Sequence, residues 1–233
     1  MNHAEIIFNQ KKITGDWRDV ADESVWTEIF KLREYRRAEE IIANSRGLIV
    51  DVGAHAGFFS LYCRALNPQI PIIAVEPEPR NIAALNKHLK LNRVENVLVE
   101  QTALAAKSGK RELFVSPDSS FHYLLTDDEK TDNKITVNCI TLNDLAKKYR
   151  INGIDLLKMD IEGGEYELVK NWGASEWGMI RQIVMEYHDH RGHRHGDIKR
   201  IMNENGFSVE EYPSKFDSSL GFIFARNKKI NHK

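Results

Sequence analysis

The sequence has little cysteine, almost no net charge and no long apolar run. Cys63 and Cys139 are the two cysteines among 233 residues, which argues against a disulfide framework or a cysteine-based zinc site. The 33 basic and 34 acidic residues give a formal net charge of −1, so no overall positive field favours nucleic acid or an anionic membrane. No stretch approaches the length of a membrane span. These absences predict a cytoplasmic protein with neither nucleic acid nor a membrane as its partner.

Internal repeats, low-complexity blocks and a linker are also absent, so the length favours one large domain. We predict that residues 47–233 form this domain and that residues 1–46 form an N-terminal extension that packs on it. In the extension, a short apolar piece around Ile6–Phe8 precedes a polar turn, TGDW. Beyond the turn, apolar residues from Val25 to Ile42 recur at helical intervals.

From Leu48 onward, short apolar strands alternate with helical segments. The core strands are predicted in Leu48–Val52, in Ile72–Val75 and in the segments NVLVEQTALA, IDLLKMD and IRQIVMEYH. The chain closes with two consecutive strands, FSVEEY and LGFIFA. This order predicts an α/β fold with a mostly parallel seven-stranded sheet, helices on both faces and a terminal antiparallel hairpin. It is the outline expected of a Rossmann-like class I methyltransferase.

Residues 111–140 interrupt the alternation. RELFVS and KITVNCI predict two strands joined by a polar loop, and we expect this insertion to face the substrate. Within the loop, Ser119, Ser120, Phe121 and His122 are candidates for covering a bound substrate, and a merely solvated loop is the alternative.

The turn after the first core strand lacks the middle glycine of a dinucleotide fingerprint. His55 lies between Gly53 and Gly57, where its imidazole would crowd a pyrophosphate but leaves room for an amino acid attached to a ribose. Asp51 offers a carboxylate to an ammonium group. Glu76 ends the next strand. It follows the turn by roughly twenty residues, which is the separation expected of a carboxylate that binds ribose hydroxyls. The turn therefore favours S-adenosylmethionine (SAM) over NAD.

The same residues have structural alternatives. Gly53 and Gly57 can merely permit a tight turn with close helix packing, and Asp51 can cap a helix. Acids at the ends of two further strands, Glu76 and Asp160, favour the SAM interpretation.

Five segments in chain order resemble the FkbM family of SAM-dependent methyltransferases: VDVGAHAGFFSLY, AVEPEPRNIAALNKHLKLN, NVLVEQTALA, TLNDLA and IDLLKMDIEGGEYELV. The similarity begins at about Glu23 and includes EIFKLREY and VMEYH. It implies a class I methyltransferase fold and transfer of the SAM methyl group, usually to an oxygen of a sugar, glycan or natural product. It also implies that Asp51 and the turn glycines surround the methionine, that Glu76 binds the ribose and that Thr102 and Ala103 lie near the adenine. His55 stands where the family commonly has asparagine. The predicted cofactor-binding residues are Asp51, Gly53, His55, Gly57, Phe58, Glu76, Pro77, Thr102, Ala103 and Asp160.

Two strand ends carry the candidate catalytic groups. A strand period places Lys158, Asp160 and Glu162 on one side, and the next strand ends with Glu186 and His188. Asp160 suits both the SAM end and the acceptor, and an imidazole suits proton removal near neutral pH. Lys158, Glu162 and Glu186 have the alternative role of an ion-paired support.

Histidines are concentrated after the fifth core strand. Four of the nine fall within eight positions: His188, His190, His193 and His195. Their spacing matches no standard zinc signature, so no metal ligand is predicted. Magnesium held by Asp160 with Glu186 or Asp189 is the alternative for a hydroxyl acceptor.

These features predict a SAM-dependent O-methyltransferase with a small-molecule or glycan acceptor. N-methylation of a small molecule or nucleobase is one alternative; the near-neutral charge and the lack of an N-P-P-Y-type motif count against a nucleic acid. A SAM-binding module without turnover is another, and the intact acids at three strand ends count against it.

Overall fold

A seven-stranded sheet forms the centre of the molecule, with the strand order β12-β13-β11-β10-β3-β4-β5. The strands are β3 (Leu48–Val52), β4 (Ile72–Val75), β5 (Val97–Glu100), β10 (Ile154–Met159), β11 (Gln182–His188), β12 (Phe207–Pro213) and β13 (Leu220–Asn227). Within this sheet the neighbouring strands β11, β10, β3, β4 and β5 are parallel, whereas β13 is antiparallel to both β11 and β12. The computed structural model describes residues 2–116, 122–125, 131–189, 192–214, 217 and 219–230.

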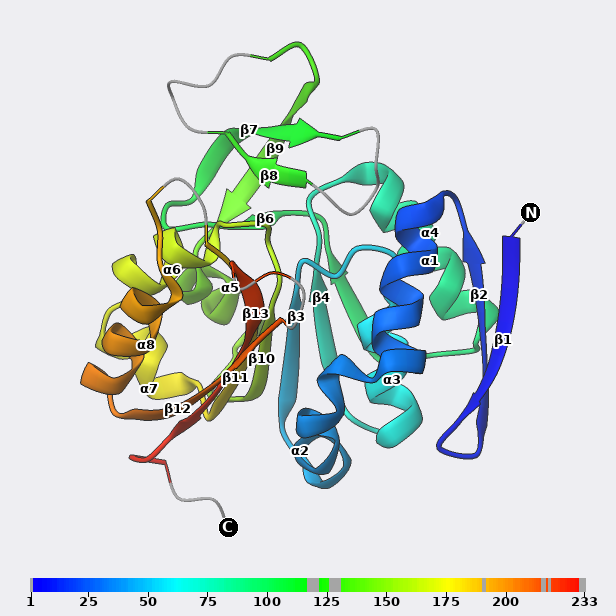
Figure 1. Ribbon diagram of the computed structural model, residues 1–233, viewed down its shortest axis with the longest axis horizontal. Coiled ribbons are helices and arrows are strands. Elements are labelled where there is room, and N and C mark those ends of the chain that lie inside the picture. Colours follow the sequence, from blue (N-terminus) through cyan, green and yellow to red (C-terminus); the bar gives the residue numbers. More distant parts are fainter. Residues whose placement is uncertain are drawn as a thin grey trace.

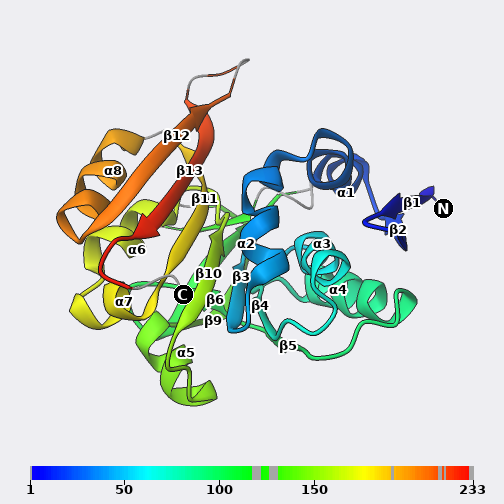
Figure 2. The same ribbon diagram turned by 90° about the horizontal axis from the view of Figure 1, so that it is seen from below.

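Helices cover both faces of this sheet (Figures 1 and 2). One layer contains α2 (Glu39–Asn44), α3 (Phe58–Leu66) and α4 (Pro79–Leu91), and the other contains α5 (Leu142–Tyr149), α6 (Glu165–Asn171), α7 (Ala174–Met179) and α8 (His195–Glu204). Alternation along β3 explains the two layers, because Ile49 belongs to the core on one face while Val50 and Val52 belong to the core on the other. The predicted fold class is confirmed.

The N-terminal residues form an antiparallel hairpin of β1 (Asn2–Phe8) and β2 (Lys11–Trp17). The predicted polar turn at TGDW is wrong, because these residues lie within β2. Gly15 is needed there for packing: a Cβ on Gly15 would lie 2.7 Å from the ring of Trp26. A glycine in a strand thus marks a close approach of an aromatic ring rather than a turn.

The helical intervals predicted after Val25 correspond to several short helices. These are α1 (Val20–Trp26), a π-helical turn (Thr27–Leu32), a 3₁₀ helix (Glu34–Ala38) and α2. Arg33 separates the π-helical turn from the 3₁₀ helix with a φ of +55°, a left-handed conformation that ends a helix. Of the predicted apolar face, Ile29, Tyr35 and Ile42 belong to one buried cluster on both sides of the break, whereas Leu32 is exposed.

A second, smaller sheet lies above the main one in Figure 1. Its order is β6-β9-β7-β8, with β6 (Ala103–Leu104), β7 (Gly109–Val115), β8 (His122–Leu124) and β9 (Lys134–Ile140). The two strands predicted in the insertion are β7 and β9. Ser119, Ser120 and Phe121 lie outside the described residues.

Both cysteines are buried, and neither forms a disulfide. None of the helices in the described part of the chain has the length and apolar content that a membrane crossing requires.

Candidate active site

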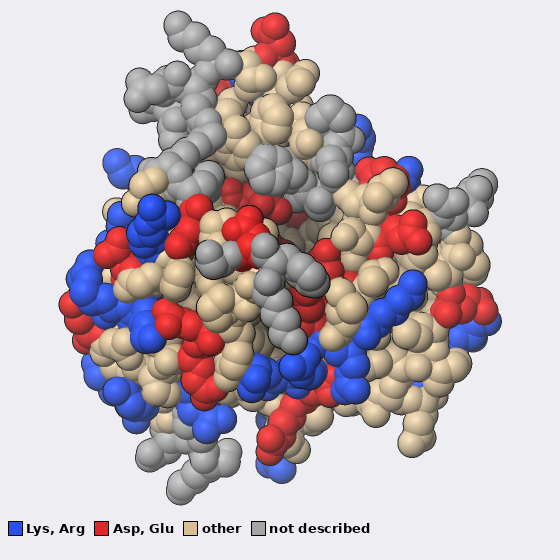
Figure 3. Space-filling model, viewed as in Figure 1, with Lys and Arg blue, Asp and Glu red and all other residues tan. Residues whose placement is uncertain are grey.

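A cavity of about 540 Å³ lies at the carboxyl ends of β3, β4 and β10. The connections reverse direction between β3 and β10, which is where an open α/β sheet binds its ligands. Acidic side chains gather around the central hollow in the space-filling view (Figure 3). The predicted site residues that line the cavity are Gly53, His55, Phe58, Glu76, Pro77, Thr102, Ala103, Lys158, Asp160, Glu162 and Glu186. Three others, Asp51, Gly57 and His188, are not part of this lining.

The turn after β3 requires glycine at two positions. Gly53 has a φ of +72° and Gly57 a φ of +83°, conformations that favour glycine. A Cβ on Gly53 would lie 1.8 Å from the backbone oxygen of Asp160, and one on Gly57 would lie 2.9 Å from Leu85. The turn therefore passes directly against β10 and α4, which leaves space for a ligand on its cavity side.

Asp51 and Lys158 form a buried ion pair beneath this turn. The Asp51 carboxylate is fully buried; it accepts a hydrogen bond from Ser60 Oγ at 2.8 Å and lies 3.5 Å from Lys158 Nζ. Lys158 also donates to the backbone oxygen of Gly53 at 2.8 Å and lies 3.6 Å from Asp160. Burial alone would lower the pKa of Lys158, but the carboxylates of Asp160 and Asp51 outweigh it and raise the pKa. A charged ammonium accepts no proton, so these contacts fit the ion-paired support left open for Lys158.

Glu76 is held by backbone and side-chain donors. One carboxylate oxygen accepts from the backbone nitrogen of His55 at 2.9 Å, and the other accepts from Glu78 N at 3.0 Å and Asn81 Nδ2 at 3.2 Å. Burial raises its pKa. Each oxygen has two lone pairs, and Oε2 accepts only one of these bonds, so it retains capacity for a hydroxyl of a ribose at the cavity wall.

Three carboxyl groups and one imidazole meet near the end of β11. His188 Nε2 lies 3.4 Å from the Glu162 carboxylate and 4.0 Å from that of Glu186. Burial, reinforced by the charge of Asp160, raises the pKa of Glu162 to about 9 and that of Glu186 well above its usual range. Glu162 also has a φ of +54°, a conformation that is uncommon for glutamate and that concentrates at functional sites.

The same region can be compared with the requirements of a metal ion. One potential ligand atom from each of Asp160, Glu186 and His188 lies within 4.8 Å of the others, and carboxylate and imidazole groups are common metal ligands. Of the other clustered histidines, the two in the described residues have different partners: His193 stacks on Tyr166 and His195 binds Asp189. His190 lies outside the described residues.

Several lining residues were not predicted from the sequence, among them two acids of the N-terminal segment. Glu28 and Glu34 reach the cavity from the N-terminal residues. Burial and the charge of Asp160 raise the pKa of Glu28, and burial with the charges of Glu28 and Asp160 raises that of Glu34 to about 7. The available signal was EIFKLREY, in which two acids interrupt an apolar helical pattern.

Glu34→Gln is expected to change the pH dependence of stability. The folded protein retains a proton on Glu34 up to about pH 7, whereas the unfolded chain releases it near the ordinary glutamate pKa of 4.5. The free energy of unfolding therefore decreases as pH rises through this window. Relative to wild type, the variant should gain stability between about pH 5 and pH 8, as measured by calorimetry of ligand-free protein. Glu23→Gln, on an exposed part of the same segment, should run parallel to wild type; equal pH profiles for all three proteins would contradict the assignment.

Comparison with known proteins identifies the family. A model of the methyltransferase FkbM domain matches residues 51–209. Methyltransferase sdnD of Sordaria araneosa is 30% identical over 200 residues, with 72% of this chain and 77% of the relative covered. The 31-O-demethyl-FK506 methyltransferase FkbM of Streptomyces tacrolimicus is 28% identical over 214 residues, covering 79% and 81%. Magnesium protoporphyrin IX methyltransferase from Synechocystis PCC 6803 has a similar fold, with a TM-score of 0.54 at 13% identity over 92% and 87% of the two chains. This chain therefore belongs to the FkbM methyltransferase family and is a SAM-dependent methyltransferase.

Proposed function

We propose that this protein is an O-methyltransferase that acts on a hydroxyl of a sugar, glycan or natural product. The observation that carries this proposal is the group of Asp160, Glu162 and Glu186 on the cavity wall, with His188 against two of them. A hydroxyl becomes a good nucleophile when a nearby group accepts its proton. The name of the Streptomyces relative, which specifies 31-O-demethyl-FK506, supports an oxygen acceptor.

The cofactor roles follow from the contacts of the turn. Glu76 binds a ribose hydroxyl through Oε2, and Gly53 allows the methionine portion to lie against the backbone. Asp51 acts through Lys158, whose ammonium group fixes the carbonyl oxygen of Gly53. When bound, SAM supplies a methyl group already activated by its positively charged sulfur. Thr102 and Ala103 line the cavity and serve the adenine.

Glu162 and His188 form the proton relay of this proposal. The raised pKa leaves Glu162 protonated near neutral pH. One Glu162 oxygen takes the proton of the acceptor hydroxyl while the proton on its other oxygen moves to His188 Nε2. The acceptor oxygen keeps the electron pair of its broken O–H bond for a new bond to the methyl carbon, and the pair of the broken carbon–sulfur bond would remain on sulfur in S-adenosylhomocysteine, the leaving group. Asp160 and Glu186 orient the acceptor in the cavity.

Matched acceptors distinguish oxygen from nitrogen methylation. Glucose and glucosamine differ by a hydroxyl and an amine at one carbon, so they serve as paired probes beside a panel of hydroxylated natural products. With isotope-labelled SAM, mass spectrometry should locate the label on oxygen. Label found only on nitrogen would favour the N-methyltransferase alternative, and the absence of any methylated product across the panel would favour a binding module.

Glu76→Ala is expected to weaken SAM binding by about 1–3 kcal/mol because the ribose loses hydrogen bonds to a fixed carboxylate. Isothermal titration calorimetry with SAM and with S-adenosylhomocysteine measures this loss, and NAD should not bind to wild type.

Glu100→Ala provides a matched control for this measurement. Glu100 ends the neighbouring strand β5 and binds Lys148 and Tyr149, so the affinity for SAM should remain near that of wild type. Equal affinities of wild type and Glu76→Ala, or tight NAD binding, would contradict the role of Glu76.

A further inference from the structure

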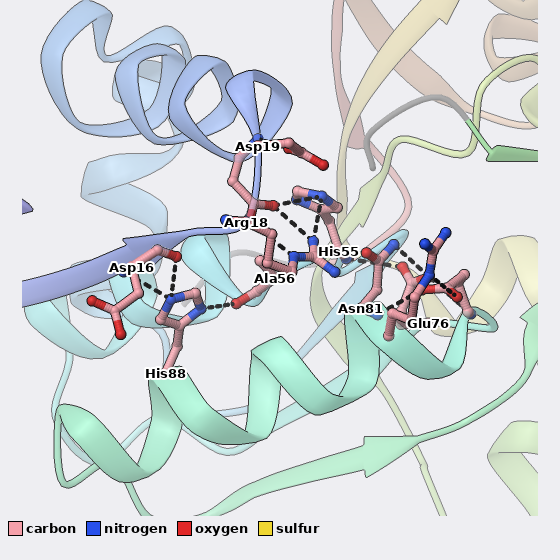
Figure 4. A network of polar contacts seen from close by, with 11 residues as sticks. Asp16, Arg18, Asp19, His55, Ala56, Glu76, Asn81 and His88 are labelled. Carbon is pink, nitrogen blue, oxygen red and sulfur yellow. Dashed lines mark hydrogen bonds and ion pairs between the residues drawn. The ribbon is translucent and has the colours of Figure 1, made fainter. Parts of the chain in front are cut away.

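The N-terminal segment, residues 2–46, contacts the turn from Gly53 to Gly57 through polar groups that include the fully buried Asp22. This segment lies outside residues 51–209, which match the family model. Figure 4 shows the backbone of Asp16 in β2 facing His88 and the side chain of Arg18 facing His55. Two separate groups of contacts join the segment to the turn.

The first group consists of Arg18, Asp22 and His55. Arg18 Nε and Nη2 donate to the two carboxylate oxygens of Asp22 at 2.8 and 2.7 Å, and the backbone nitrogen of Arg18 donates to the same carboxylate at 2.7 Å. His55 Nε2 lies 3.2 Å from Arg18 Nη2 and 3.2 Å from Asp22 Oδ1. Burial alone would raise the pKa of Asp22, but the hydrogen bonds from Arg18 outweigh it and lower the pKa. A charged, bidentate pair therefore fixes the imidazole.

The second group is centred on His88 in α4. His88 is buried, with Nδ1 2.8 Å from the backbone oxygen of Ala56 and Nε2 3.1 Å from the backbone nitrogen of Asp16. It bridges β2 and the residue that follows His55. The turn is thus held at two successive residues.

His55, whose imidazole is fixed by Arg18 and Asp22, also orients Glu76. The backbone nitrogen of His55 donates to Glu76 Oε2 at 2.9 Å. His55 has a φ of +48°, a conformation that a non-glycine residue retains where its surroundings enforce it. Arg18 and Asp22 provide that enforcement through the side chain, and the backbone transmits it to the carboxylate.

We infer that Arg18 and Asp22 are positioning residues for the cofactor: by fixing His55, they set the orientation of the Glu76 carboxylate toward the ribose. This inference rests on the proposed role of Glu76. It assigns part of the SAM site to a segment that the family model does not cover. Neither Arg18 nor Asp22 lines the cavity, so both act through His55.

A double-mutant cycle tests the inference. Arg18→Ala and His55→Ala should each raise the Kd for S-adenosylhomocysteine and the KM for SAM by roughly 10-fold, the lower end of what loss of an orienting partner costs at metal sites. The double variant should bind about as well as either single variant, because the two residues act as one unit. At saturating SAM, kcat should stay near wild type. His55→Asn retains a side-chain hydrogen-bonding group next to Arg18 and should restore most of the affinity.

Arg33→Ala is the matched control, since Arg33 forms a bidentate pair with Glu39 in the same segment away from the turn. Its Kd should equal that of wild type, and melting of each ligand-free variant reports whether it is folded. Additive effects in the double variant, a loss confined to kcat, or an equal loss in Arg33→Ala would each overturn the inference. Glu76→Ala, measured alongside, separates the two proposals. An unchanged Kd in Glu76→Ala contradicts the role of Glu76. A raised Kd in Glu76→Ala together with an unchanged Kd in Arg18→Ala contradicts only the positioning role.

Discussion

His188→Ala is expected to lower kcat by about 10²–10⁴-fold, the usual contribution of a positioned proton acceptor, while SAM affinity stays near wild type. The imidazole lies 3.4 Å from Glu162 and does not line the cavity, so its removal leaves the cofactor contacts of Glu76 in place. Single-turnover rates and SAM titrations on the same preparations separate the two effects. Glu162→Gln should cause a comparable loss of kcat, because the relay requires both residues.

Chelation distinguishes this route from metal assistance. If magnesium bound by Asp160, Glu186 and His188 polarises the acceptor hydroxyl, EDTA should abolish wild-type turnover, added Mg²⁺ should restore it, and Asp160→Asn should be more damaging than His188→Ala. If the proton relay operates without a metal, wild-type activity should persist in EDTA. His195→Ala, which removes a histidine bonded to Asp189, serves as the control and should retain kcat. Full activity of His188→Ala in EDTA would contradict the relay and leave Asp160 as the remaining candidate base.

The central sheet was predictable because its strands are buried on both faces. Such strands appear in the sequence as short apolar runs, as in Leu48–Val52, and a polar or acidic residue follows where the strand leaves the core. The order of strands and helices then restricts the topology. The N-terminal hairpin was not predictable in the same way. Its second strand contains Gly15 and Asp16, which are typical of a turn, and the packing of Trp26 against Gly15 is visible only in the structure.

Some residues of the candidate site were likewise predictable from the sequence, and others were not. Glu76 and Asp160 were placed at the cavity because the ends of parallel strands meet at one edge of a sheet. Position at a strand end does not determine the direction of a side chain, and Asp51 faces Ser60 and Lys158 instead of the cavity. Arg18, Glu28 and Glu34 were missed as site residues because a distant segment of the chain brings them to the site through tertiary packing.

Gly53→Ala is expected to destabilise the fold by roughly 2–6 kcal/mol, the sum of a forced left-handed conformation and an overpacked contact. The residue has a φ of +72°, and the added Cβ would lie 1.8 Å from the backbone oxygen of Asp160. Since that oxygen belongs to the chain at the end of β10, no side-chain rotation relieves the overlap. The turn must move away from β10, which also displaces the carbonyl that Lys158 binds. SAM binding should therefore be lost together with stability.

Gly178→Ala is the matched control for Gly53→Ala, because it makes the same substitution at a position without a close contact. Gly178 lies in α7 and is exposed, and a Cβ added to it would meet no atom within 4 Å. The same substitution should there increase stability by about 0.4–1 kcal/mol, because alanine restricts the unfolded chain. Urea denaturation of the two ligand-free variants and wild type measures both changes, with circular dichroism to detect a variant that does not fold. If Gly53→Ala unfolds within about 1 kcal/mol of wild type and still binds SAM, the turn has room for a side chain and the close approach to β10 is not what requires glycine there.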